Sequence, residues 1–128
     1  MKIEHVAWMM PDPVAAADWY CRNLGFRIAR HTEGYPWGYF LLDSSGSVMV
    51  EIYKRKEVTV PDYNTVDPLL LHLALATDDV KGAVARLTAA GAKLLGEVTT
   101  TPDGDELAML RDPWGFAIQL CKRAKPML

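Results

Sequence analysis

The stretch IEHVAWMMPDPVAAADWYCRNLG, residues 3–25, holds the signals of a strand, a helix start and a helix end. Residues 3–10 are mostly apolar and are followed by a proline, which predicts a strand. Asp12 is a typical N-cap and is followed by a proline, the residue favoured at the first helical position. The helix is expected to run to about Leu24, because Gly25 is a typical residue at the position after a helix end.

Three further strands are expected after this helix. Residues 26–31 form an apolar and basic run, and residues 38–43 and 48–54 flank the sequence SSGS. A short run of serine and glycine between two apolar segments indicates a hairpin turn. The first half of the chain therefore predicts the element order βαβββ.

The second half of the chain repeats this order. Residues 69–77 predict a strand, Asp78 or Asp79 is the expected N-cap of a helix, and the helix is expected to end near Gly91. DPWG predicts the turn of a second hairpin. The last three strands are expected over residues 93–98, 106–111 and 116–122.

The two halves predict one α+β chain built from a duplicated βαβββ module. The modules cover about residues 1–56 and 69–123, and residues 57–68 form a connector that its two prolines keep extended. Both helices are amphipathic. The apolar face of the first helix is expected at Ala15, Trp19, Cys21 or Arg22, and Leu24. That of the second is expected at Val80, Val84, Leu87 and Ala90.

Composition limits the possible partners. The chain has 128 residues, 50% of them hydrophobic and 23% charged, which fits one globular domain. The net charge of −2 gives no electrostatic reason to expect nucleic acid or a membrane surface as a partner. No apolar run is long enough to span a bilayer, and the N-terminus lacks the apolar region of a signal peptide. We expect a cytoplasmic protein in which Cys21 and Cys121 are free thiols.

Four polar residues interrupt otherwise mostly apolar strand faces. His5 and His72 occupy the same place in the first strand of each module, and Glu51 and Gln119 the same place in the last strand. If a pseudo-twofold axis relates the modules, these four side chains can converge. Imidazole, carboxylate and amide oxygen are ligands for divalent nickel, zinc, cobalt, manganese or iron.

Each of these residues also has an ordinary structural explanation. A single histidine in a strand is more often hydrogen-bonded within the protein than bound to a metal. Glu51 and Gln119 are compatible with solvent-facing positions on their strands. Their symmetric placement as a set of four favours a metal site.

The sequence resembles the vicinal oxygen chelate superfamily, which includes glyoxalase I, over nearly its whole length. The resemblance rests on the runs IEHVAWMMPDP, DWYCRNLGFRI, VMVEIY, LLHLALATDDV, ARLTAAGAKLL and RDPWGFAIQL. It implies a glyoxalase-like fold of curved mixed sheets and a homodimer. It also implies a divalent metal held by His5, Glu51, His72 and Gln119, which chelates the oxygens of a small-molecule substrate and stabilises an enolate, as in lyases and isomerases of the family.

Gln119 departs from the family pattern, in which a glutamate usually stands on the last strand. Glutamine cannot accept a proton, so Glu51 is the expected catalytic base. The expected substrate contacts are apolar and aromatic residues near these positions, namely Met9, Trp37, Phe40 and Met49. Each of them is also compatible with a position in the hydrophobic core. The arginines, Arg111 among them, are interpreted as solvated surface.

The resemblance leaves two alternatives open. A metal-free, ligand-binding dimer of the bleomycin-resistance type would explain why a glutamine is tolerated at position 119. An extradiol-type dioxygenase would use His5, His72 and Glu51 as a set of two histidines and one carboxylate for iron(II). Against the dioxygenase, the carboxylate lies on the fourth strand, whereas those relatives carry it on the last.

Overall fold

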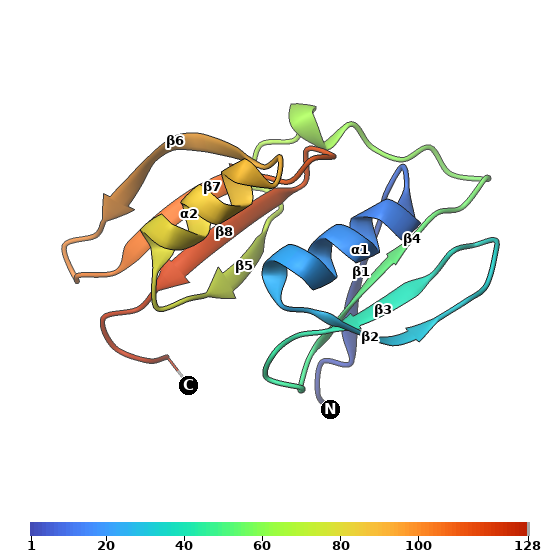
Figure 1. The fold of residues 1–128 in the computed structure, drawn as a ribbon, viewed down its shortest axis with the longest axis horizontal. Helices are drawn as coiled ribbons and strands as arrows, with labels where there is room; N and C mark the ends of the chain where they lie inside the picture. Colours follow the sequence, from blue (N-terminus) through green and yellow to red (C-terminus); the bar gives the residue numbers. More distant parts are fainter. Residues whose placement is uncertain (128) are drawn as a thin grey trace. The chain divides into compact units, whose positions relative to one another are not determined.

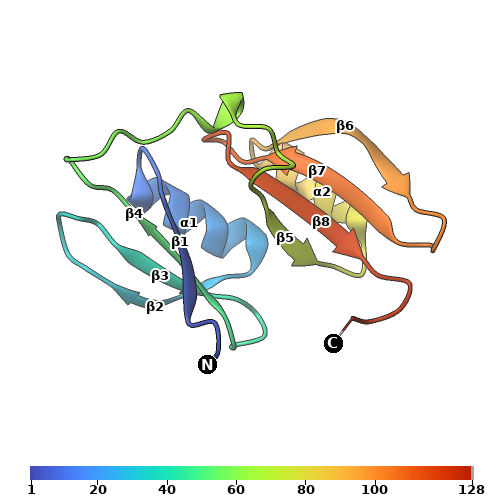
Figure 2. The ribbon, with the colours of Figure 1, turned by 180° about the vertical axis from the view of Figure 1, so that it is seen from behind.

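A computed structural model describes residues 1–127, which divide into two compact units, Met1–Pro61 and Asp62–Leu128. Each unit has one helix lying over one face of a four-stranded mixed sheet (Figures 1 and 2). The α+β class and the duplicated βαβββ order are confirmed. Within residues 1–127, no helix is long and apolar enough to cross a membrane.

The first unit contains one sheet of strand order β1-β4-β3-β2. Strand β1 pairs parallel with β4, and the other two pairings are antiparallel. Strand β1 is therefore one edge of this sheet and β2 the other. The elements are β1 (His5–Met9), α1 (Pro13–Leu24), β2 (Arg27–His31), β3 (Tyr39–Leu42) and β4 (Met49–Tyr53).

Helix α1 starts and ends at the residues that the sequence indicates. The Asp12 side chain accepts a hydrogen bond from the Ala15 amide at 3.0 Å, and Gly25 follows the helix with φ +75°. The buried face is not the predicted one, because Ala15 is exposed and Trp19 only half-buried. The helix instead buries Pro13, Ala16, Ala17 and Tyr20.

The shift of the buried face has a packing reason. Ala16 and Ala17 are small enough to let the helix backbone approach the sheet, and Tyr20 is fully buried between aromatic neighbours. Its ring centroid lies 6.4 Å from that of Trp8 and 6.1 Å from that of Phe26. These ring contacts of Tyr20 are tertiary, so helical periodicity alone cannot predict them.

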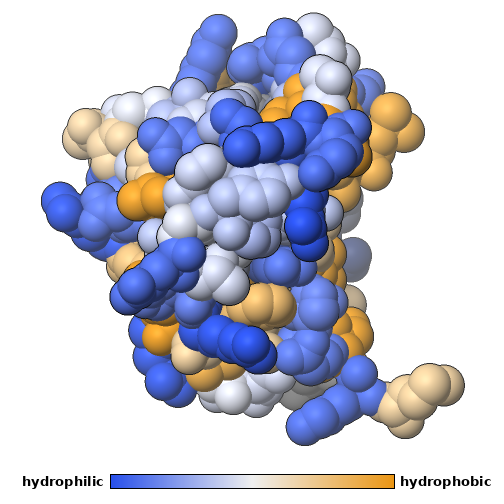
Figure 3. Space-filling model, turned by 90° about the vertical axis from the view of Figure 1, so that its right-hand side faces the viewer, coloured by the Kyte–Doolittle hydropathy of each residue, from blue (hydrophilic) through white to orange (hydrophobic). Residues whose placement is uncertain are grey.

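Exposed polar residues cover the outer edge of the first sheet. All five residues of β2 are exposed, and three of them are Arg27, Arg30 and His31. Charged side chains on an edge strand oppose pairing with another strand. Hydrophilic residues dominate the face of the molecule seen in Figure 3, where hydrophobic residues form small separate groups.

The second unit repeats the architecture with strand order β5-β8-β7-β6, in which β5 pairs parallel with β8. A short 3-10 turn precedes the repeat of the first unit's elements. The elements are η1 (Tyr63–Thr65), β5 (Leu73–Ala76), α2 (Val80–Ala89), β6 (Lys93–Thr100), β7 (Glu106–Arg111) and β8 (Ala117–Lys122).

Strand β5 begins at Leu73 and not at position 69 as the apolar run predicts. Asp67 causes the delay. Its carboxylate accepts a hydrogen bond from the Leu69 amide at 2.8 Å, and its carbonyl accepts one from the Leu70 amide at 2.9 Å. These bonds hold the chain in a turn, so His72 lies immediately before the strand instead of inside it.

The segment before this turn is also not fully extended. Residues Tyr63–Thr65 form one 3-10 turn, capped by the Asp62 carboxylate, which accepts a hydrogen bond from the Asn64 amide at 3.1 Å. An aspartate that bonds the amide two residues later is a common turn initiator.

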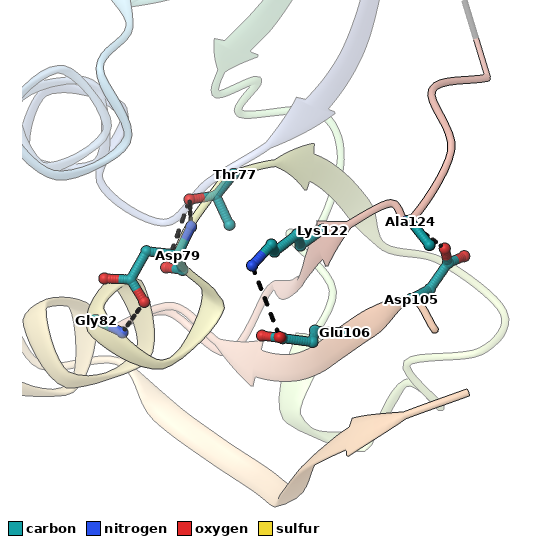
Figure 4. A network of polar contacts seen from close by, with 7 residues as sticks. All are labelled: Thr77, Asp79, Gly82, Asp105, Glu106, Lys122 and Ala124. Atoms are coloured by element: carbon teal, nitrogen blue, oxygen red, sulfur yellow. Dashed lines mark hydrogen bonds and ion pairs between the residues drawn. The ribbon is translucent and has the colours of Figure 1, made fainter. Parts of the chain in front are cut away.

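Helix α2 and the last strand are held by polar contacts within the second unit (Figure 4). Asp79 is the N-cap, and its carboxylate accepts a hydrogen bond from the Gly82 amide at 2.9 Å. Lys122 forms a cross-strand ion pair with Glu106 at 3.8 Å. The helix buries Val80, Ala83 and Leu87, so Val80 and Leu87 of the predicted face are confirmed.

Asp105 fastens the segment that follows β8. Its carboxylate accepts hydrogen bonds from the Ala124 amide at 2.9 Å and from the Arg123 guanidinium at 2.6 Å. The Ala124 hydrogen bond, followed by that of Arg123, lowers the pKa of the Asp105 carboxyl. The segment after β8 is thus tied to the start of β7 by a carboxylate that stays ionised in mild acid.

Candidate functional site

The first unit brings His5 and Glu51 together. They stand on the neighbouring parallel strands β1 and β4, where Ala7 lies opposite Glu51 and Met49 lies opposite His5. The two side chains extend from the same side of the sheet, with the His5 Nε2 atom 3.6 Å from the Glu51 Oε2 atom. Their side chains are 34% and 23% exposed, so the pair is reachable from solvent.

The His5 ring is oriented by its other nitrogen. His5 Nδ1 contacts the carboxylate of Glu4, so Nε2 is the ring atom that faces Glu51. Phe40 packs edge-on against the His5 ring, with centroids 5.3 Å apart and planes at 89°. Phe40 is also directly opposite Glu51 in the antiparallel pairing of β3 with β4, the two strands that flank the turn predicted at SSGS. Two of the four predicted substrate contacts, Phe40 and Met49, therefore adjoin the His5–Glu51 pair.

The two oxygens of Glu51 have different surroundings. Oε2 faces His5, whereas a Cβ atom placed on Gly38 would lie 3.7 Å from Oε1. Because Gly38 has no side chain, nothing from that residue covers Oε1. One oxygen of the carboxylate is thus engaged with the histidine and the other is next to a position without a side chain.

The second unit carries His72 and Gln119 in a corresponding register. Gln119 lies on β8 opposite Ala74, two residues after His72, just as Glu51 lies opposite the residue two after His5. His72 Nδ1 is 2.7 Å from the Pro68 carbonyl oxygen. A carbonyl can only accept, so Nδ1 carries a proton, and in the neutral form of the ring the lone pair is therefore on Nε2.

The Gln119 amide is fixed by a neighbour on its own strand. The Cys121 thiol donates to Gln119 Oε1 at a sulfur–oxygen distance of 3.4 Å. Burial raises the pKa of the Cys121 thiol, which keeps it protonated and able to donate. Cys21, on α1, is also a free thiol.

The four predicted ligands are thus divided between the units: His5 and Glu51 lie in the first, and His72 and Gln119 lie in the second. Across residues 1–127, no group of three or more His, Cys, Asp or Glu side chains is placed to hold a metal ion. The four-ligand set therefore stays a prediction.

The remaining predicted contacts lie elsewhere in the first unit. Met9 is the last residue of β1 and pairs with Tyr53. Trp37 borders a small cavity of about 320 Å³, together with residues 11–14 and Lys54, and this cavity includes neither His5 nor Glu51. The Trp37 backbone has φ +50°, a left-handed conformation that is uncommon for a large side chain.

A larger cavity, of about 750 Å³, belongs to the second unit. It runs along β5 and the end of β8, where Ala74, Ala76 and Cys121 contribute small side chains and Met127 contributes an apolar one. Ala74 and Cys121 lie on the same side of the sheet as Gln119. This cavity could not be predicted from the sequence, because two alanines in an apolar strand give no distinctive signal.

The interpretation of Arg111 as a solvated surface residue is wrong. The Arg111 guanidinium donates three hydrogen bonds to backbone carbonyls. The acceptors are Tyr63 at 2.6 Å, Val66 at 2.8 Å and Gly115 at 2.8 Å. No local pattern reveals these bonds, because two of the acceptors lie 48 and 45 residues away in the chain.

The fold has many solved relatives. A glyoxalase family protein from Bacillus cereus superposes with a TM-score of 0.81 at 18% identity, covering 95% of this chain and 93% of that one. TnmS3, an antibiotic binding protein from Streptomyces sp. CB03234, gives 0.75 at 24% identity, with 97% of each chain covered. A glyoxalase/bleomycin resistance protein from the same Streptomyces gives 0.67 at 25% identity, with 93% and 98% covered.

A comparison with functionally curated proteins gave no match. A family model, described as Glyoxalase/Bleomycin resistance protein/Dioxygenase superfamily, matches residues 2–120. The match spans both units and all four predicted ligand positions. The chain therefore belongs to the Glyoxalase/Bleomycin resistance protein/Dioxygenase superfamily.

Proposed function

We propose that this chain is a glyoxalase-like enzyme of the lyase or isomerase type, with a divalent metal ion held by His5, Glu51, His72 and Gln119. The observation that carries the proposal is the His5–Glu51 pair, in which a ring nitrogen and a carboxylate oxygen face each other at 3.6 Å. The proposal also includes a homodimer and a small-molecule substrate that offers oxygen atoms.

The His5–Glu51 geometry fits a shared cation. When the His5 ring is neutral and its Nδ1 proton is directed to Glu4, Nε2 presents a lone pair to the Glu51 carboxylate. Two acceptors that face each other repel unless a proton or a metal ion lies between them. Ligand atoms about 2.1 Å from one metal ion are roughly 3.0 to 3.5 Å apart in octahedral or tetrahedral geometry, close to the observed separation.

His72 has the features of a metal-binding histidine. Its Nδ1–H group donates to the Pro68 carbonyl, which fixes the tautomer and leaves Nε2 as the ligand atom. Metal-bound histidines commonly donate their second N–H to a carbonyl or carboxylate in this way. His5, with its Nδ1 on Glu4, has the same arrangement.

The donor set leaves the site with net positive charge. Glu51 is its single anionic member, because an amide oxygen such as that of Gln119 is neutral. A divalent ion bound there supplies Lewis-acid stabilisation of negative charge on substrate oxygens.

Glu51 is the residue proposed to move the proton. Gln119 cannot accept one, and Glu51 Oε1 lies beside Gly38, which has no side chain to cover it. Glu51→Gln is expected to abolish turnover and to leave the fold intact, since the two side chains have the same shape. Folding is checked by circular dichroism, and turnover by a screen of 2-oxoaldehyde adducts and epimerisable acids.

The metal site is tested by calorimetric titration of the chelator-treated protein with nickel, cobalt, zinc, manganese and iron(II). We expect saturable binding to the wild type and a loss of affinity in His5→Ala of at least the roughly 100-fold that an outer-shell change can cause. His31→Ala is the matched control, because His31 stacks on Tyr39 and is outside the proposed ligand set. Equal affinities of the wild type and His5→Ala for every ion would disprove the site.

A metal-free binding protein is the second candidate, and Gln119 favours it. Such a protein needs no proton acceptor on the last strand, and TnmS3, which shares the fold, is an antibiotic binding protein. In that case a protonated His5 and Glu51 would form a simple ion pair. The titration separates the candidates, because this second protein binds none of the metals.

A further inference from the structure

We infer that Arg111 is a positioning residue for His72 and acts through the backbone of residues 63–68. This inference rests on the proposed function, since it assigns Arg111 the task of presenting the Nε2 atom of a metal ligand. The hydrogen bonds that Arg111 donates go to backbone carbonyls and not to the four proposed ligands. It acts by holding the peptide group to which His72 is bonded.

The guanidinium joins two segments that are distant in the chain. Nη1 donates to the Tyr63 carbonyl at 2.6 Å and to the Gly115 carbonyl at 2.8 Å, and Nη2 donates to the Val66 carbonyl at 2.8 Å. The planar fork of an arginine can hold several acceptors in fixed directions, whereas the single ammonium of a lysine cannot. Arg111 therefore fixes residues 63–66 against the turn between β7 and β8.

Packing reinforces this attachment. The Tyr63 ring is buried and contacts the Phe116 ring edge-on, with centroids 5.0 Å apart. Asn64 lies so close to Gly115 that a Cβ atom on the glycine would be 2.6 Å from the Asn64 side chain. The turn itself is held by the buried Asp112 carboxylate, which accepts hydrogen bonds from the amides of Trp114 and Phe116. Arg111 thus holds residues 63–66 against a turn that has its own side-chain hydrogen bonds.

The carbonyls bonded to Arg111 lie close in the chain to the carbonyl that is bonded to His72. The Val66 carbonyl, bonded to Arg111, is two residues before the Pro68 carbonyl that accepts the His72 Nδ1–H bond. The intervening Asp67 holds the turn through its bonds to the Leu69 and Leu70 amides. The position of the Pro68 carbonyl is therefore set from both sides, and it selects the tautomer of His72.

The test uses the full chain with Arg111→Met, which retains the length of the side chain but loses all three hydrogen bonds. In the metal-free protein at about pH 8, where imidazole is neutral, ring ¹⁵N shifts report the tautomer of each histidine. We expect His72 to be the Nδ1–H tautomer in the wild type and a mixture in Arg111→Met. The Kd for nickel is expected to rise about 10- to 100-fold, the usual cost of losing an outer-shell partner. Arg86→Met, an exposed arginine of α2, is the matched control and should change neither quantity.

Separate outcomes decide the inference and the proposed function. A folded Arg111→Met protein with the wild-type His72 tautomer would overturn the inference, whatever the nickel affinity. A tautomer mixture in a protein whose wild type binds no metal would support the positioning and overturn the proposed function. If Arg111→Met does not fold, Arg111→Lys is measured in the same way. It retains the charge, and the same shift of the His72 tautomer is expected because one ammonium cannot replace the fork.

Discussion

At the scale of single residues, position 119 sets the charge of the proposed metal site. Gln119 is neutral, so a divalent ion bound with Glu51 retains a formal charge of about +1. Gln119→Glu adds a carboxylate and should lower the Kd for nickel by on the order of tenfold or more, because opposite charges attract strongly when partly shielded from water. Titration calorimetry measures the change.

Gln119→Met is the matched control for that prediction, because it is similar in length and has no oxygen. It should bind nickel more weakly than the wild type. Equal affinities in the wild type, Gln119→Glu and Gln119→Met would show that position 119 takes no part in metal binding.

Single residues also show which parts of the candidate site could be predicted from the sequence. Strand alternation identifies His5 and Glu51 as polar residues on mostly apolar strand faces. Their approach to 3.6 Å depends on the parallel pairing of β1 with β4, which spacing along the chain does not set. The Pro68 carbonyl beside His72 and the guanidinium of Arg111 could not be predicted. Their contacts depend on a turn at Asp67 and on residues 45 or more positions apart, which local pattern does not encode.

At the scale of elements, the capping residues of the helices could be predicted more accurately than the buried helix faces. Asp12, Asp79 and Gly25 mark helix ends through local hydrogen bonds or backbone conformation. The buried face of α1 depends on how closely Ala16 and Ala17 let the helix approach the sheet, which is a tertiary property. The hydrophobicity of residues 69–72 predicts a strand there, but the Asp67 hydrogen bonds hold these residues in a turn and β5 begins at Leu73.

The turn between β7 and β8 requires a glycine at position 115. Gly115 has φ +89°, and a Cβ atom there would lie 2.6 Å from Asn64. Gly115→Ala should lower the free energy of unfolding by more than the roughly 1–2 kcal/mol of the left-handed conformation alone. Denaturant unfolding measures the loss. Gly96→Ala is the control, since it has φ +70° and nothing within 4 Å, and an equal loss in both variants would rule out the contact with Asn64.

The segment after β8 should respond to acid through Asp105. Its pKa is lowered by the Ala124 amide and by Arg123, so its stabilising effect is fully present above the ordinary value of 3.8 and is lost as pH falls through the lower folded value. The Ala124 amide resonance should therefore titrate below pH 3.8, and Asp105→Asn should remove this titration. Asp103→Asn is the control, and a midpoint at or above the ordinary value would contradict the role of these hydrogen bonds.

At the scale of the whole molecule, the duplication explains why the fold could be predicted. The same order of strand, helix and turn patterns occurs twice in the sequence, so each half strengthens the prediction for the other. The two halves correspond to the compact units Met1–Pro61 and Asp62–Leu128. The same duplication distributes the proposed ligands equally. Each unit holds one proposed histidine ligand and one proposed oxygen ligand, which is half of the four-ligand set.

This distribution makes metal stoichiometry the decisive property of the whole molecule. If binding needs both proposed ligand pairs, His5 with Glu51 and His72 with Gln119, the wild type should bind one divalent ion per chain. His5→Ala with Glu51→Ala, and His72→Ala with Gln119→Ala, should each abolish binding completely, because two ligands hold an ion far more weakly than four. If the units instead bound metal independently, the wild type would take up two ions and each double variant would retain one. Nickel titration of the three proteins, with circular dichroism as the control for folding, therefore tests whether the duplicated halves act as one site.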